Sequence, residues 1–193
     1  VEVRLNARVT SVDEDGVWIG EEHLRSATVL WAAGVKGEAV AKTLGTELDR
    51  AGRVKVLPDC SIDGHPDTFV VGDLAVYTHT PDGKPVPGVC QGAMQMGAYV
   101  ARCIEDDLAG RQRGTFRYQD KGSMATIGRT KAIADLGFLR VGGLIAWLLW
   151  VFVHILFLIT FRNKVVVMVK WAWAWITYER ASRLIWRPTP HTR

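Results

Sequence analysis

The 193-residue sequence lacks the glycine-rich turns that hold nucleotide phosphates. Neither a G-x-G-x-x-G turn nor a P-loop occurs in it. A complete dinucleotide-binding domain needs such a turn after its first strand, so the chain does not contain a whole one. The chain also starts at Val1 in strand-like sequence. We therefore expect it to be part of a longer protein.

Cysteine is scarce, and its spacing excludes several kinds of site. Cys60, Cys90 and Cys103 are separated by 30 and 13 residues, and no Cys-x-x-Cys occurs. The five histidines form no spaced cluster either. The sequence therefore predicts no disulfide scaffold, no local redox pair and no metal site.

Acidic residues are nearly absent from the last quarter of the chain. Residues 141–193 hold seven basic side chains and only Glu179 as an acid, whereas residues 1–140 carry a net charge of −2. Six of the eight tryptophans also lie in 141–193. The basic excess belongs to this tail, so the charge does not indicate a nucleic-acid partner.

The tail has the composition of a membrane element. Val141–Phe161 carries no formal charge over 21 residues, and as one helix it would be about 32 Å long, enough to cross a hydrocarbon core. Val165–Ile176 contains Lys170 and three tryptophans, which suits the membrane interface. We expect 141–193 to be a membrane anchor whose first helix is embedded in the membrane. The sequence leaves open whether that helix spans the bilayer or lies in the interface, and a buried core helix is the soluble alternative.

The first 75 residues predict strands of an α/β fold. Ala7–Val12 and Val17–Gly20 flank an acidic turn and predict a hairpin. Thr28–Gly34 is a continuous apolar run, typical of a strand buried on both faces of a parallel sheet. Thr68–Asp73 predicts a second buried strand, with Val54–Val56 as a shorter one between them.

The second buried strand ends in Gly72-Asp73. This places a carboxylate at the carboxyl end of a strand, where open α/β sheets bind ligands, and Gly72 would let a ligand approach the backbone. The same dipeptide also occurs in ordinary turns.

A helix is predicted from about Gln91 to Leu108. Gln91 and Gln95 share one face of it, beside the small residues Ala93 and Gly97. Such glutamines are often plain surface residues, but the small neighbours favour close packing on a flat partner. Short antiparallel strands are expected afterwards, over 116–118, 124–127 and 131–134.

Four segments in order resemble one family. They are Leu30–Val35, Phe69–Ala75, Cys90–Gly97 and Phe116–Arg129. With the Trp-rich tail, they closely resemble the C-terminal half of type II NADH dehydrogenase, the single-subunit NADH:quinone oxidoreductase of the FAD-containing pyridine nucleotide-disulfide oxidoreductase superfamily. The last two segments and the tail are the more specific part of this resemblance.

The resemblance implies the C-terminal part of a flavoprotein with two Rossmann-like domains. Residues 1–30 would end the NADH-binding domain, 31–140 would belong to the FAD-binding domain, and 141–193 would bind the membrane. FAD would be the cofactor, with NADH and a membrane quinone as substrates and membrane lipid as a partner. A homodimer is left as an option, and the enzyme would act at the cytoplasmic side of the cell membrane.

The resemblance also assigns roles to individual residues. Gly34 would end the strand that returns to the FAD domain, and Asp73, next to Gly72, would hydrogen-bond the FAD ribityl or phosphate region. The family motif Ala-Gln-x-Ala-x-Gln matches Cys90–Gln95, with Cys90 in place of the usual alanine and Ala93 within the motif. Gln91 and Gln95 would lie between flavin and quinone, and Lys121 would stand near the flavin as a cation.

The implied reaction is hydride transfer from NADH to FAD and then two-electron reduction of quinone, without proton pumping. The 193 residues alone are expected to be inactive and not to retain FAD. A sulfide:quinone reductase is the alternative enzyme, although that chemistry needs a cysteine pair at the flavin. An inactive membrane-anchored remnant that binds a partner is the alternative that is not an enzyme. For His154, the one titratable residue of the apolar run, a place beside a quinone headgroup and an ordinary packing role both stay open.

Overall fold

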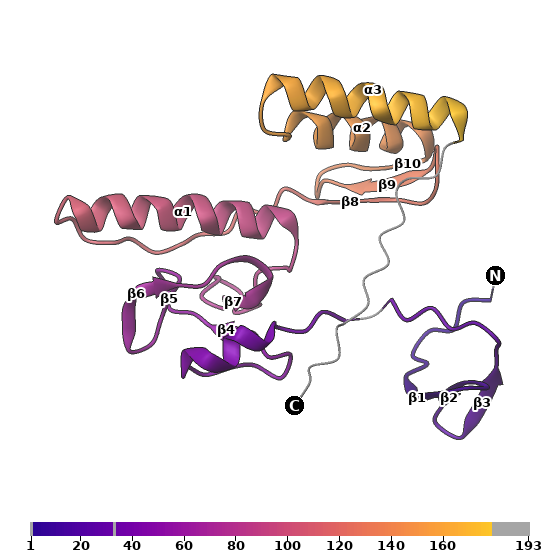
Figure 1. The fold of residues 1–193 in the computed structure, drawn as a ribbon, viewed down its shortest axis with the longest axis horizontal. Coiled ribbons are helices and arrows are strands. Elements are labelled where there is room, and N and C mark those ends of the chain that lie inside the picture. Colours follow the sequence, from indigo (N-terminus) through magenta and orange to yellow (C-terminus); the bar gives the residue numbers. More distant parts are fainter. Residues whose placement is uncertain (1, 33, 179–193) are drawn as a thin grey trace, which may run out of the picture. The chain divides into compact units, whose positions relative to one another are not determined.

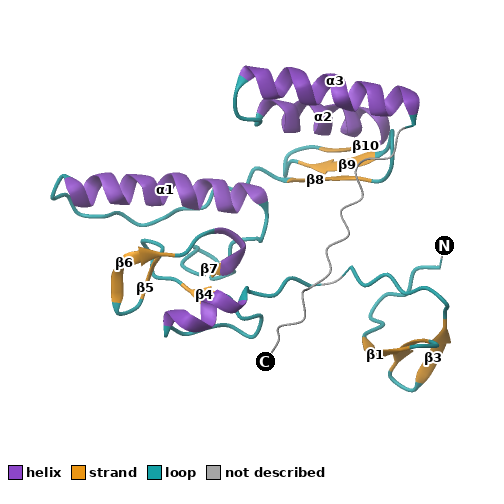
Figure 2. Cartoon of the chain, in the orientation of Figure 1, coloured by secondary structure: helices purple, strands orange, loops and turns teal. Residues whose placement is uncertain are grey.

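The computed structural model describes residues 2–32 and 34–178, so Ala33 and the basic stretch 179–193 lie outside it. The chain forms two compact units, unit 1 (Val1–Arg117) and unit 2 (Tyr118–Arg193). Figures 1 and 2 show the helices and strands of each. The division into functional segments 1–30, 31–140 and 141–193 remains a prediction.

Unit 1 begins with a small antiparallel sheet. Strands β1 (Val9–Asp13), β2 (Gly16–Ile19) and β3 (Glu22–Arg25) pair in the order β1-β2-β3. Asp13 Oδ2 accepts a 2.6 Å hydrogen bond from Trp18 Nε1, and the acidic turn lies between β1 and β2. The predicted hairpin is confirmed, and one further strand extends it.

The strand predicted at Thr28–Gly34 does not form in the described residues. This stretch is irregular, and Leu30 and Trp31 are 89% and 63% exposed. An apolar run becomes a buried strand only if other strands pair with it on the sheet. None of the described strands pairs with this stretch, so the prediction was wrong for this chain.

Four short strands build the centre of unit 1. After the 3₁₀ helix η1 (Ala39–Leu44), β4 (Val54–Lys55) pairs in parallel with β7 (Ala75–Val76), while β5 (Ser61–Ile62) pairs antiparallel with β6 (His65–Phe69).

The predicted strand Thr68–Asp73 was therefore wrong in detail. Strand β6 ends at Phe69, and Gly72-Asp73 lies in the 3₁₀ turn η2 (Gly72–Leu74). Gly72 has a φ of +68°, which breaks the extended backbone and is readily adopted only by glycine.

Helix α1 (Cys90–Leu108) confirms the predicted helix and packs through one face. Its buried residues Gly92, Met96, Tyr99 and Cys103 recur at helical spacing. Tyr99 donates a 2.6 Å hydrogen bond to the Gly114 carbonyl. The chain that returns from α1 is thus fixed along the helix, as Figure 2 shows.

Aromatic packing closes the core of unit 1. Tyr77 is 1% exposed, stacks edge-on against Phe116 at 5.1 Å and donates a 2.6 Å hydrogen bond to the Phe116 carbonyl. Phe116 is therefore buried, but 116–118 does not form the predicted strand. Its backbone N–H bonds instead to the Pro58 carbonyl.

Unit 2 is built in layers. Strands β8 (Ser123–Thr126), β9 (Ala132–Asp135) and β10 (Arg140–Gly142) form an antiparallel sheet in the order β10-β9-β8. The predicted strands around 124–127 and 131–134 are confirmed, and β10 is additional. Ala146 of the following helix packs on Ala132 and Ala134, and all three are buried.

The single helix predicted over Val141–Phe161 is wrong. The segment instead gives helix α2 (Gly143–Leu156), a turn, and the start of helix α3 (Phe161–Thr177). Thr160 separates them because its φ is +68° and its hydroxyl accepts the Asn163 N–H, capping α3. At 1.5 Å per residue α2 is only about 21 Å long. Among the described residues no helix has the length and apolarity needed to cross a membrane.

Tryptophans hold α3 against α2. Trp150 stacks on Trp171 at 5.5 Å between ring centroids, and Trp147 lies 6.4 Å from Trp175. Arg129 of the β8–β9 turn donates to the carbonyls of Ala174 and Trp175. A cation on the last carbonyls of a helix is favoured by the helix dipole, so Arg129 fixes the end of α3.

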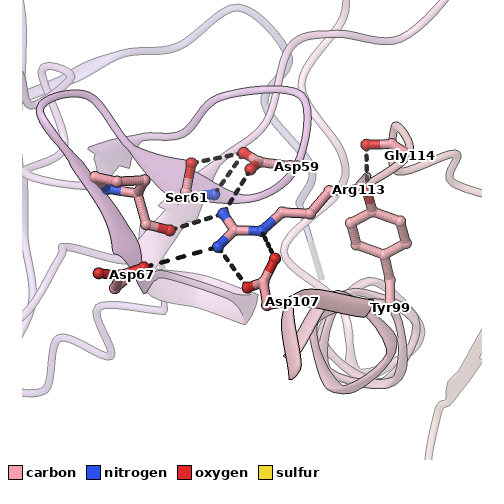
Figure 3. A network of polar contacts seen from close by, with 8 residues as sticks. Asp59, Ser61, Asp67, Tyr99, Asp107, Arg113 and Gly114 are labelled. Atoms are coloured by element: carbon pink, nitrogen blue, oxygen red, sulfur yellow. Dashed lines mark hydrogen bonds and ion pairs between the residues drawn. The ribbon is translucent and has the colours of Figure 1, made fainter. Parts of the chain in front are cut away.

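One guanidinium joins three parts of unit 1, as Figure 3 shows. Arg113 Nη1 donates to Asp59 Oδ2 at 3.0 Å and to the Pro66 carbonyl at 2.7 Å, while Nε donates to Asp107 Oδ1 at 2.7 Å. Partial burial raises the pKa of Asp59, but hydrogen bonds from Ser61 and Arg113 outweigh it and hold this pKa below its ordinary value. Arg113 therefore ties the chain after α1 to the β5–β6 hairpin.

We expect Arg113→Ala to lower the free energy of unfolding by about 2 kcal/mol, since it removes several charge-assisted hydrogen bonds and leaves Asp59 without its cation. Chemical denaturation of the protein measures this. Arg111→Ala is the control, because among the described residues Arg111 pairs with Asp106 alone and its side chain is 62% exposed. Equal losses in both variants would contradict the role of Arg113. The difference between wild type and Arg113→Ala should shrink as the pH falls below about 4, where protonation of Asp59 removes the interaction from the wild type.

Candidate functional site

The first turn of α1 and the η2 turn meet in unit 1. A Cβ added to Gly72 would lie 3.1 Å from the Ala93 Cβ, and one added to Gly88 would lie 3.5 Å from Asp73 Oδ1. A Cβ on Gly92 would lie 2.9 Å from the Pro87 carbonyl oxygen. These glycines allow three backbone segments to approach closely, and we call the place where they meet the α1 niche.

The α1 niche is shallow. Gly72, Asp73, Gly88 and Ala93 line it together with Arg53, and its enclosed volume is about 10 Å³. A ligand larger than a water molecule would therefore lie across its rim. The Arg53 guanidinium is held by Asp49, with 2.7 Å between Nη2 and Oδ2.

Asp73 stands at this rim with an exposed carboxylate. Within the part of the chain that the structure describes, no hydrogen bond or ion pair joins it to another residue. Helix α1 begins beside this carboxylate. The N-cap residue of the helix, Val89, offers no side-chain acceptor to the first N–H groups. The rim thus combines a carboxylate that can accept hydrogen bonds with N–H donors that favour negative charge.

The glutamines lie on the same helix, four residues apart. Gln91 and Gln95 are both half-buried, on the edge of the face that α1 packs into unit 1. Cys90 is exposed at the first position of the helix and donates to Met94 Sδ at 3.5 Å. The structure therefore brings Cys90, Gln91, Ala93 and Gln95 to the same end of α1 as Gly72 and Asp73.

Gly34 is not brought to the α1 niche by any described contact. It has a φ of +82° in the irregular stretch after β3, and an added Cβ would meet nothing within 4 Å. The strand that it was expected to end does not form in the described residues, and none of their contacts holds Gly34 against the site.

Lys121 belongs to unit 2. It is exposed in the turn before β8, and its Nζ lies 5.9 Å from the centre of the Phe157 ring. Phe157 is the C-cap residue that follows α2, and it is 45% exposed. Sequence reasoning missed Phe157, because 36 residues separate it from Lys121.

Sequence reasoning also missed Gly88 and Arg53. Gly88 lies next to the Asp73 carboxylate, although it is far from Asp73 in the sequence. The signal was Pro87-Gly88 directly ahead of the helix, where a backbone without a side chain can approach a neighbour. No comparable signal in the sequence marks Arg53.

His154 and Cys60 have ordinary structural surroundings, His154 on the exposed side of α2 and Cys60 in the interior of unit 1. His154 stacks on Trp150 at 4.0 Å, and its Nδ1 bonds to the Trp150 carbonyl at 2.7 Å. Burial, together with Asp59 and Cys103, raises the pKa of Cys60 to about 12. A thiol that stays protonated is a poor nucleophile, so Cys60 is unsuited to sulfide chemistry.

The α2–α3 hairpin forms a second surface of interest. Many large apolar side chains on it are exposed, among them Leu148, Phe152, Trp173 and Ile176. A groove of about 820 Å³ between the helices is lined by the stacked tryptophans and by Leu144. An exposed apolar surface of this extent is typical of a membrane or protein contact.

Comparison with known proteins gives the same family by sequence. Residues 121–178 match the family model described as the NDH2 C-terminal domain. The chain is 41% identical over 197 residues to the type II NADH:quinone oxidoreductase Ndh of Mycobacterium tuberculosis and 40% identical over 199 residues to NdhA of the same organism. Each alignment covers 96% of this chain and 41% of the relative, so the chain spans less than half the length of these relatives.

More distant relatives agree with this result. A type II NADH:quinone oxidoreductase of Staphylococcus haemolyticus is 32% identical over 132 residues, covering 66% of this chain and 33% of that protein. Among solved structures, NDH2 of Plasmodium falciparum in complex with NADH has a TM-score of 0.70 at 16% identity, over 86% of this chain and 50% of that one. This last likeness concerns the fold.

We expect Gly72→Ala to destabilise the protein by about 1–2 kcal/mol more than Gly64→Ala, as measured by urea denaturation. Both glycines have a positive φ, +68° and +76°, so both variants carry similar backbone strain. Only at Gly72 would the new methyl group press on Ala93, whereas Gly64 faces open space. Equal destabilisation would show that the contact between η2 and α1 is not tight.

Proposed function

This chain carries an NDH2 C-terminal domain and is homologous to type II NADH:quinone oxidoreductases, and we propose that it forms part of a membrane-bound flavoenzyme. That enzyme transfers a hydride from NADH to FAD and two electrons from FAD to a membrane quinone, without pumping protons. The observation that carries the proposal is the α1 niche, where Asp73 and the start of α1 meet next to Gln91 and Gln95. The sequence relatives of the chain support the same proposal.

The residues of the α1 niche fit a flavin nucleotide. Asp73 has a carboxylate without a described partner, which suits the ribityl hydroxyl groups as hydrogen-bond donors. Gly72 and Gly88 lack the side chains that would keep a ligand away from the backbone. The uncapped start of α1 favours negative charge on a ligand group that lies at the helix N-terminus.

Bound FAD would supply the hydride and electron chemistry, and the protein would position and tune it. In this proposal Gln91 and Gln95 stand between the flavin and the quinone and orient both through their amides. Lys121 contributes a cation that stabilises negative charge on a quinone oxygen. Cys90, in place of the usual alanine, adds a thiol at the start of the same helix.

The α2–α3 hairpin is proposed to lie in the membrane interface. Its exposed apolar residues would become buried in the membrane, and its tryptophans suit the level of the lipid headgroups. Arg162, Lys164 and Lys170 in α3 add positive charge that anionic lipids attract. A lipid-soluble quinone would then reach the enzyme from the membrane, with the catalytic part on the cytoplasmic side.

Gln91→Ala and Gln95→Ala are predicted to slow flavin reoxidation by quinone about three- to tenfold, the effect of losing one hydrogen bond in the reacting complex. Flavin reduction by NADH should stay unchanged. Stopped-flow absorbance of the full-length enzyme separates the two half-reactions. Gln112→Ala, in the exposed loop after α1, is the control and should match wild type in both. Equal losses in the two half-reactions would count against the quinone role.

Replacing Leu148, Phe152, Trp173 and Ile176 together with glutamine should reduce binding to anionic lipid vesicles at least tenfold, since burial of each such side chain is worth about 1.5–3 kcal/mol. Co-sedimentation measures the bound fraction. Leu108→Gln, at an 86% exposed position at the end of α1, serves as the control for a change of an exposed apolar residue in unit 1. Undiminished sedimentation of the fourfold variant would rule out the hairpin as the membrane contact.

A further inference from the structure

We infer that Phe157 is a positioning residue for Lys121, holding its ammonium group for the quinone half-reaction. The inference rests on the proposed function of Lys121 and adds the residue through which unit 2 controls it. Three observations carry it: a fixed backbone at Lys121, a contact between its ammonium and the Phe157 ring, and the place of Phe157 at the α2–α3 turn.

The backbone around Lys121 has little freedom. Asp120 Oδ1 accepts a 2.8 Å hydrogen bond from the Gly122 N–H. Gly122 has a φ of +86°, and a Cβ there would overlap the Asp135 carbonyl and lie 2.8 Å from the Leu136 Cα. Ser123 then pairs with Asp135 in the sheet. The side chain of Lys121 therefore starts from a fixed backbone position next to β9.

The side chain of Lys121 is long and exposed, so its backbone alone cannot fix the ammonium group. Within the described residues no carboxylate forms an ion pair with Lys121. Its Nζ lies 5.9 Å from the centre of the Phe157 ring. This is within the range of a cation–π interaction, so the ring limits where the ammonium can go.

Phe157 is itself held by the fold. It is the C-cap residue that follows α2, and its backbone N–H donates to the Val153 carbonyl at 3.2 Å. Helix α2 in turn packs on the sheet through Ala146, against Ala132 and Ala134. The sheet that fixes the Lys121 backbone thus also supports the helix whose end carries the ring. Both ends of the contact belong to the same packed unit.

The contact also sets where the cation stands. Phe157 opens the turn between the two helices whose apolar surfaces are exposed. The ammonium group is therefore placed at the turn end of the α2–α3 hairpin, the surface proposed to meet the membrane. A quinone headgroup that arrives along that surface would meet a cation already oriented by the protein.

The test uses the full-length enzyme with bound FAD and a water-soluble short-chain quinone, so that membrane binding does not enter. Phe157→Leu should slow flavin reoxidation about two- to fivefold, the factor that an exposed cation–π contact supports. FAD content and flavin reduction by NADH should equal those of wild type. Phe157→Trp should restore the reoxidation rate, since it keeps an aromatic face. Phe138→Leu, at an 87% exposed position in the β9–β10 turn, is the matched control and should be neutral.

A double-mutant cycle separates positioning from general damage to the fold. Lys121→Met should slow reoxidation, and Phe157→Leu should cause no further loss in the Lys121→Met enzyme. The inference would be overturned by equal slowing in both backgrounds, by a Trp variant as slow as the Leu variant, or by a Lys121→Met enzyme as fast as wild type. Failure of the wild-type enzyme to reduce quinone with NADH would instead refute the proposed function itself.

Discussion

Unit 1 depends on the contacts of one guanidinium. Arg113 follows the end of α1 and bonds to Asp59, to Asp107 and to the Pro66 carbonyl. The chain between Gly114 and Phe116 can then follow α1 and accept hydrogen bonds from Tyr99 and Tyr77. Because strands β4 to β7 are short, they give the helix little support through pairing alone. Arg113 thus anchors the C-terminal end of α1, the helix whose first turn packs against Gly72.

The sequence predicted the elements whose signals are local. Helix α1, the β1–β2 hairpin and strands β8 and β9 follow from periodicity and turn residues within each segment. The motif Cys90–Gln95 was likewise predicted to lie on one helix, and it lies at the start of α1. Thr28–Gly34 failed because a buried strand needs partners that its own composition cannot supply. The single helix over Val141–Phe161 failed because hydropathy carries no information on helix ends. Helix α2 ends at Leu156, Thr160 caps the next helix, and 140–142 pair with β9 instead.

Contacts across long separations were beyond prediction for the same reason. The approach of Gly88 to Asp73 requires the η2 turn, whose positive φ breaks the strand predicted there. The ring of Phe157 reaches Lys121 only because α2 folds back over the sheet. In both cases the residue types were visible in the sequence, but the packing that joins them depends on other elements.

The close approach at Gly122 limits which residues around Lys121 can be changed. Any side chain at this position would overlap the backbone of the neighbouring strand and displace the start of β8. Gly122 can therefore not be replaced without disturbing the sheet, whereas Phe157 is 45% exposed and lies outside the sheet. Under the proposed function, a change that adjusts the surroundings of the lysine cation would therefore be made at the turn between α2 and α3, far along the sequence from the lysine.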